Sequence, residues 1–86
     1  MPVSQEKEVV GILDAVLSLQ GRANSFQRDT PLLGALPELD SMAVLGIMTM
    51  LEDRFGFSIH DDEIDGSVFA TLGSLADFVE AKLAAH

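Results

Sequence analysis

The chain has 86 residues, with 14 aspartate and glutamate residues against 5 lysine and arginine residues, so its formal net charge at pH 7 is −9. Phosphate groups repel such a chain, which excludes sequence-independent binding to DNA or RNA. The chain contains no cysteine, so disulfides, thiolate metal sites and cysteine nucleophiles are excluded as well. Because 48% of the residues are hydrophobic, we expect residues 1–86 to fold as one small domain.

The charge is distributed unevenly along the chain. Residues 37–86 hold ten acids against two bases, a net charge of −8, whereas the run at 42–51 holds no charged residue. The first residues, Met1–Glu6, lack the basic start and apolar stretch of a signal peptide, and every apolar run is too short to cross a bilayer. We therefore expect a cytoplasmic monomer without a membrane span.

A first helix is predicted over residues 4–19, with Ser4 as its N-cap and Gly21 just beyond its end. The connection at 21–40 contains two prolines and several apolar residues, so we expect it to pack on the core. The apolar residues of the first helix recur at helical spacing, at Val9, Ile12, Leu13, Val16 and Leu17.

Three further helices are predicted, over residues 41–55, 61–65 and 72–84. The sequence shows no strand alternation, so the fold class is predicted to be all-α. We expect a four-helix bundle with a short third helix and a long loop between helices one and two. The apolar face of the second helix comprises Val44, Ile47, Met48, Leu51 and Phe55. The residues expected to begin or end these helices are Ser41, Gly56, Gly66 and Thr71.

The acidic segment after the second helix partly matches a calcium-binding loop. Asp61, Glu63 and Asp65 fall on the first, third and fifth positions of that motif, and Gly66 falls on the sixth. The twelfth position, which requires a glutamate, holds Leu72. We therefore predict no metal site and interpret these carboxylates as the N-terminal turn of the short helix.

Catalysis by the chain itself finds no support in the sequence. A nucleophile at Ser41 would need a base, and the only histidines are His60 and His86. The chain has no Gly-x-Ser-x-Gly motif, and a core of this size leaves little room for a cleft that excludes water. We predict that the protein is not an enzyme.

The residues around Ser41 carry the most specific signal. The loop ends in Leu39-Asp40-Ser41-Met42, and the uncharged run then leads to Phe55-Gly56-Phe57 and to the Thr71-Leu72-Gly73 entry into the last helix. Over roughly residues 5–83 this pattern resembles the acyl carrier proteins, which are phosphopantetheine-binding carriers. Their hallmark is a serine in an Asp-Ser-Leu or Asp-Ser-Met triplet at the start of the second helix of a four-helix bundle.

The resemblance implies that a phosphopantetheinyl transferase attaches 4′-phosphopantetheine to the Ser41 hydroxyl, and that the thiol of this arm carries acyl groups as thioesters. A helix N-terminus favours the negative phosphodiester of the arm. The resemblance also assigns Asp40 to recognition by the transferase and Met42 to an apolar partner contact beside the arm. Its further implied partners are an acyl ligase or synthase and acyltransferases, and its bundle can open to shelter the acyl chain.

The chain departs from the carriers of fatty-acid synthases, which usually show acids two and five places after the serine. Those places hold Ala43 and Gly46. For Gly46, close approach of a neighbouring helix is an open alternative to a partner contact. A helical projection places four residues away from the core face: Met42, Ala43, Gly46 and Met50. Partners with basic patches are expected to meet the acids at the ends of this face: Glu38, Asp40, Glu52 and Asp53.

These departures predict a specialised carrier rather than the housekeeping fatty-acid carrier. The segments LPELDSM, DDEIDG and ATLGSL also resemble discrete carriers that accompany exosortase and exopolysaccharide loci, whose partner is an AMP-forming acyl ligase. Two alternatives stay open. One is a peptidyl carrier that bears an amino acid on the same arm, and the other is an unmodified interaction module whose helix at 42–51 occupies a groove of a partner.

The crowding of carboxylates in residues 37–86 generates a prediction about stability. Added salt or millimolar Mg²⁺ is expected to raise the melting temperature, because screening weakens the repulsion between these groups. Thermal unfolding followed by circular dichroism across a salt series measures this effect. A melting temperature that stays constant across the series would contradict it.

Overall fold

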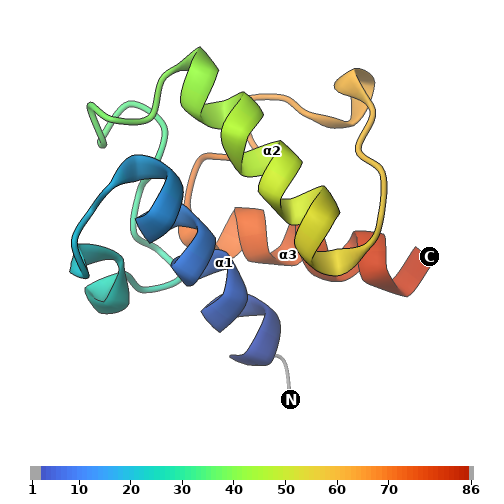
Figure 1. The fold of residues 1–86 in the computed structure, drawn as a ribbon, viewed down its shortest axis with the longest axis horizontal. Coiled ribbons are helices and arrows are strands. Elements are labelled where there is room, and N and C mark those ends of the chain that lie inside the picture. Colours follow the sequence, from blue (N-terminus) through green and yellow to red (C-terminus); the bar gives the residue numbers. More distant parts are fainter. Residues whose placement is uncertain (1–2, 86) are drawn as a thin grey trace.

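The computed structural model describes the backbone of residues 3–85 and the side chains of residues 6–60 and 62–84. The chain forms three α-helices, α1 (Val3–Leu17), α2 (Ser41–Phe55) and α3 (Leu72–Ala85), which are labelled in Figure 1. Two short 3-10 helices lie in the connections, η1 (Arg22–Ser25) and η2 (Asp61–Glu63). Both α2 and α3 pack on α1, so α1 joins the two other helices into one bundle.

The short helix predicted over residues 61–65 is confirmed only in part, because Asp61–Glu63 form a 3-10 helix and residues 64–65 are not helical. The Asp65 carboxylate accepts hydrogen bonds from the backbone N–H of Ser67, at 2.9 Å, and from the hydroxyl of the same residue. This local turn competes with helical hydrogen bonds and ends the helix early. The described part of the chain is therefore all-helical, as expected, but has three α-helices rather than four and no strand.

The first helix ends two residues earlier than predicted. Ser18 and Gln20 have φ angles of 55° and 56°, which a right-handed helix cannot contain. The Asp14 carboxylate accepts hydrogen bonds from the backbone N–H groups of Gly21 and Ala23, at 2.9 and 3.3 Å, and holds this turn against the helix end. Gly21 therefore leads into η1 instead of closing α1.

Two of the other predicted helix ends are confirmed. Gly56 ends α2 in the left-handed region, with φ 74°, and its N–H donates to the carbonyl of Glu52 at 2.9 Å. Thr71 caps α3, because its hydroxyl accepts from the N–H of Ser74 while the hydroxyl of Ser74 accepts from the N–H of Thr71. Ser4, the expected N-cap of the first helix, lies inside α1, and its side chain lies outside the described residues.

The connection between α1 and α2 packs on the core, as predicted. Leu32 and Leu39 are buried, while Leu33 stays exposed. Backbone hydrogen bonds of 2.9 Å from Leu32 to Ala70 and from Leu33 to Phe69 tie this connection to the segment before α3. The apolar stripes predicted for the first two helices, and the stripe at Leu72, Leu75, Val79 and Leu83 predicted for the last, face the core. Most of their residues are buried, and Val16, Val44, Phe55 and Leu83 are half-buried against the same cluster.

Ion pairs join elements that are distant in the sequence. Arg28 bridges α1 and α3, since its guanidinium lies 3.5 Å from Glu6 and 2.8 Å from Asp77. These carboxylates raise the pKa of Arg28, Asp77 contributing most. The other pairs are Arg22–Glu38, Arg54–Glu8 and Lys82–Glu63. Because these side chains are largely at the surface, the pairs orient segments more than they stabilise the fold.

No helix among the described residues combines the length and the apolar character that a membrane crossing requires.

Two helical glycines provide a matched test of the packing. A Cβ atom on Gly73 would lie 2.8 Å from the backbone oxygen of Arg28, whereas one on Gly11 would meet nothing within 4 Å. Gly73→Ala is therefore expected to destabilise the protein by about 1–3 kcal/mol, through overpacking against a backbone atom. Gly11→Ala is expected to stabilise it by about 0.5–1 kcal/mol, through helix propensity.

Urea denaturation of both variants measures these two free energies of unfolding. An equal effect of the same sign in both variants would contradict the close approach of Arg28 to α3.

Candidate functional site

Ser41 is the first residue of α2 and its side chain is exposed. The N-cap is the preceding residue, Asp40, whose Oδ1 atom accepts a hydrogen bond from the N–H of Ala43 at 2.8 Å. The prediction that Ser41 caps the helix is therefore wrong. Aspartate is as good an N-cap as serine, and here Asp40 is the cap. As a result the Ser41 hydroxyl is not used for capping and stands at the positive end of the α2 dipole.

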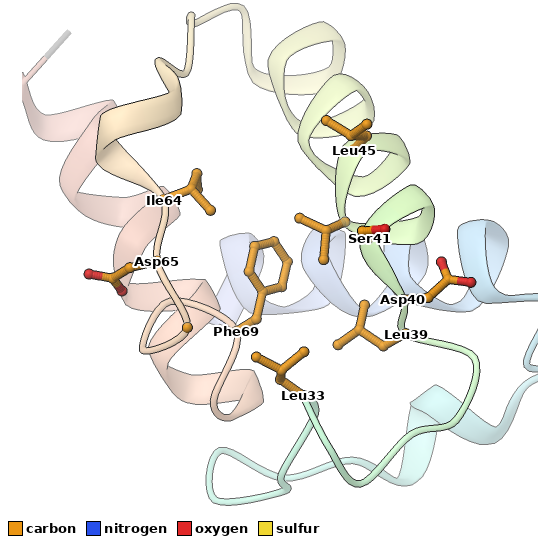
Figure 2. A pocket seen from close by; sticks show the side chains of 10 residues that line it. Leu33, Leu39, Asp40, Ser41, Leu45, Ile64, Asp65 and Phe69 are labelled. Atoms are coloured by element: carbon orange, nitrogen blue, oxygen red, sulfur yellow. The ribbon is translucent and has the colours of Figure 1, made fainter.

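A cavity of about 510 Å³ lies beside Ser41. Figure 2 shows it between the start of α2 and the segment that contains Ile64, Asp65 and Phe69. Its polar lining residues are Asp40, Ser41 and Asp65, all exposed at the surface. The rest of the lining, apart from Gly66, is hydrocarbon: Leu33, Leu39, Val44, Leu45, Ile64 and Phe69.

Two exposed apolar side chains line this cavity, and a third, Met42, directly follows Ser41 in the chain. Met42, Leu45 and Leu33 are 74%, 56% and 46% exposed, and the latter two line the cavity itself. The partner-binding face predicted from the sequence includes Met42 but not Leu45. The exposure of Leu45 could have been predicted from the sequence, because this residue lies one helical turn after Ser41 in the uncharged run and outside the predicted core stripe.

The partner-binding face that was projected on α2 is only partly correct. Met42 and Met50 are exposed, as projected, but Ala43 is half-buried against the core. A Cβ atom on Gly46 would lie 3.3 Å from Cγ1 of Val16, so the absence of a side chain lets α1 approach α2 there. The alternative of a close helix neighbour is thus the one that the structure supports for Gly46.

The four acids expected at the ends of the partner-binding face differ in their surroundings. Glu38 pairs with Arg22 at 2.6 Å, and its pKa is lowered by its own backbone N–H and by the guanidinium. Glu52 accepts a hydrogen bond from the N–H of Ile59 at 2.7 Å. Asp40 caps α2, which leaves Asp53 as the exposed acid of the four without such a contact among the described residues.

Among the side chains that the structure describes, which do not include that of Asp61, no group of three potential metal ligands is found. Glu63 instead binds Lys82 at 2.7 Å and accepts from the N–H of His60, and both contacts lower its pKa, the lysine most. The hydrogen bonds from Ser67 lower the pKa of Asp65. These carboxylates therefore hold the connection in place.

Comparisons with known proteins identify the family of the chain. The family model for the phosphopantetheine attachment site matches residues 8–79. The chain belongs to this family.

The fold supports the same assignment. The chain is similar to the solution NMR structure of a holo acyl carrier protein from Nitrosomonas europaea, with 51% sequence identity and a TM-score of 0.86. The match covers 92% of this chain and 95% of that chain. A search of curated proteins finds no match.

As a member of this family, the protein is an acyl carrier with a covalently attached 4′-phosphopantetheine arm and not a catalyst. The alternative of an unmodified interaction module is therefore wrong. A carrier of this kind interacts with the enzymes that modify it and with the enzymes that use its cargo.

The Asp40 cap gives a direct test of how the site is built. Asp40→Ala is expected to lower the free energy of unfolding by about 1 kcal/mol, because the N–H of Ala43 loses its acceptor. Asp40→Ser is the control, since a serine at this position can accept the same hydrogen bond. Chemical denaturation measures both, and an alanine variant as stable as wild type would contradict the cap.

Proposed function

We propose that Ser41 is the residue that carries the 4′-phosphopantetheine arm. One observation supports this most strongly. Ser41 combines an exposed hydroxyl, a place at the first turn of α2, and contact with the apolar cavity. The arm supplies a thiol, which forms thioesters and which a chain without cysteine does not have.

The surroundings of Ser41 suit the phosphodiester that joins the arm to the protein. The first backbone N–H groups of a helix have no partner within the helix, and the helix dipole places partial positive charge there. The Asp40 side chain accepts a hydrogen bond from the N–H of Ala43. The first hydrogen bond within the helix runs from the N–H of Val44 to the carbonyl of Asp40, so the N–H groups of Ser41 and Met42 have no acceptor within the helix. A negative group on the Ser41 hydroxyl is therefore stabilised by the start of α2.

The cavity favours an acyl cargo over an aminoacyl cargo. Its inner wall consists of hydrocarbon side chains, and its carboxylates lie at the exposed rim. An alkyl chain gains free energy when it leaves water for such a wall, whereas the ammonium group of an aminoacyl thioester would lose hydration. We therefore assign acyl intermediates as the cargo, with a peptidyl carrier as the alternative.

The surface around Ser41 also suggests how partners dock. Met42 and Leu45 offer exposed apolar contacts beside the attachment site, and methionine adapts readily to different surfaces. Asp40 and Asp53 offer carboxylates to basic residues of a transferase, a loading acyl ligase or an acyltransferase. The first turns of α2 carry no acid, whereas the carriers of fatty-acid synthases usually show two there, which supports a specialised pathway, of the kind that exopolysaccharide loci encode, rather than housekeeping fatty-acid synthesis.

The attachment site is tested by intact-protein mass spectrometry. The apo protein is incubated with coenzyme A, Mg²⁺ and a broad-specificity phosphopantetheinyl transferase. The wild-type protein is expected to gain the mass of one arm, and Ser41→Ala is expected to gain none.

Ser58→Ala is the matched control, because Ser58 is also an exposed serine but lies beyond the end of α2. It should gain the arm as the wild type does. Modification of Ser41→Ala, or no modification of the wild type, would overturn the assignment of Ser41.

A further inference from the structure

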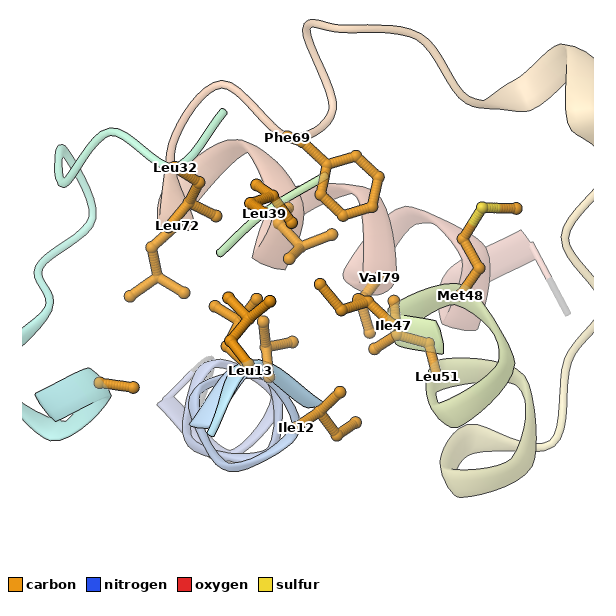
Figure 3. Packing of buried hydrophobic residues seen from close by; sticks show 14 of the residues in the cluster. Ile12, Leu13, Leu32, Leu39, Ile47, Met48, Leu51, Phe69, Leu72 and Val79 are labelled. Atoms are coloured by element: carbon orange, nitrogen blue, oxygen red, sulfur yellow. The ribbon is translucent and has the colours of Figure 1, made fainter. Parts of the chain in front are cut away.

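Asp65 and Gly66 form the only Asp-Gly pair in the chain. Both residues are exposed and lie outside the helices, between η2 and α3. Buried residues anchor the connection on both sides of the pair, since Ile59 is 8% and Phe69 is 2% exposed. Figure 3 shows the Phe69 ring against the buried cluster. The pair therefore lies in a stretch of chain whose two ends are held by the core.

The backbone nitrogen of Gly66 is free to react with the side chain that precedes it. Within the described residues, the N–H of Gly66 has no hydrogen-bond acceptor. Glycine has no Cβ atom, so nothing on this residue shields the nitrogen or restricts its rotation. A five-membered ring closes when this nitrogen bonds to the Cγ atom of Asp65, and an exposed turn leaves room for that closure.

Ser67 opposes this reaction in the folded protein. Its backbone N–H donates a hydrogen bond to Oδ1 of Asp65 at 2.9 Å, and its hydroxyl donates to the same atom. These contacts lower the pKa of Asp65, the hydroxyl contributing most, because they stabilise the charged form. Ring closure requires the neutral carboxyl group, since a carboxylate has no leaving group. The hydrogen bonds therefore reduce the reactive fraction.

We propose that Asp65 is a site of spontaneous isoaspartate formation and that the Ser67 hydroxyl slows this modification. In the first step the Gly66 nitrogen bonds to Cγ of Asp65, and the carboxyl O–H leaves with the amide proton as one water molecule. In the second step water opens this succinimide at the main-chain carbonyl carbon of Asp65. The chain then runs through Cγ and the α-carboxyl group is free, whereas opening at Cγ restores aspartate.

The modification changes the connection at a sensitive place. It lengthens the main chain by one methylene group between the anchors Ile59 and Phe69, and it removes the carboxylate that Ser67 binds. Figure 2 shows that this carboxylate points away from the Phe69 ring, so the free α-carboxyl group forms at the solvent side of the segment. That group is the one that isoaspartyl methyltransferases methylate from S-adenosylmethionine. The modified chain is thus a substrate of that enzyme class, whether or not an arm is attached at Ser41.

The test keeps the folded full chain at neutral pH and physiological temperature for several weeks. Electron-transfer fragmentation locates isoaspartate at position 65, and a purified isoaspartyl methyltransferase with labelled S-adenosylmethionine measures its amount. The wild type is expected to accumulate the product. Ser67→Ala is expected to accumulate it about threefold faster, for the loss of one exposed hydrogen bond to the charged form.

Two further variants separate the hydroxyl from an effect on folding. Ser67→Thr keeps the hydroxyl and is expected to react at the wild-type rate, whereas Ser67→Val has the same shape without it and is expected to react as Ser67→Ala does. Circular dichroism confirms that each variant is folded. Equal rates in the valine and threonine variants would overturn the role of the Ser67 hydroxyl.

Gly66→Ala is the matched control for the site itself. A Cβ atom on Gly66 would lie 3.8 Å from Cδ2 of Leu33, an ordinary contact, and Gly66 does not have a positive φ angle, so alanine fits there. The added methyl group hinders ring closure, and the isoaspartyl product is expected to be lost. No isoaspartate at position 65 in the wild type, or an undiminished rate in Gly66→Ala, would overturn the proposed site.

Discussion

The packing of α2 and α3 on the shared helix α1 is the constraint on which the rest of the structure depends. Gly46 allows α2 to approach Val16 of α1 closely, and buried residues of α3 complete the same core. Because α1 provides the common surface, the space between α2 and α3 is bounded by the connecting segment that carries Ile64 and Phe69. The cavity lies between this segment and the start of α2 (Figure 2).

The start of α2 places the proposed attachment site, Ser41, beside this cavity. The N-cap of α2 is Asp40 and not Ser41. The Ser41 hydroxyl is therefore not needed as a cap, and the side chain is exposed. The same helix end provides the unpaired N–H groups and the partial positive charge that suit a phosphodiester. One aspartate thus stabilises the helix and orients the proposed attachment site, while the apolar side chains of Met42 and Leu45 lie within the next turn.

Much of this arrangement could be predicted from residue patterns. The helical spacing of Val9, Leu13 and Leu51 identified core faces that are buried, and the Asp40-Ser41-Met42 triplet identified the family that the comparisons show. Two of the errors concern helix ends, where the local backbone and its hydrogen bonds depart from the helical pattern. Asp65 turns the chain back on Ser67 where a helix was expected, and the positive φ angles after α1 end that helix early.

The sequence by itself determined the fold class, the helices that carry apolar stripes, and the family, because helical periodicity and a short motif are local properties of the chain. Only the tertiary structure decided which residues of α2 face solvent, since Gly46 and Ala43 are turned toward neighbours that no helical projection contains. It also decided that Glu38 and Glu52 have contacts within the protein, because Arg22 and Ile59 come near them only when the chain folds. The cavity likewise depends on residues from three distant segments, so no single stretch of sequence reveals it.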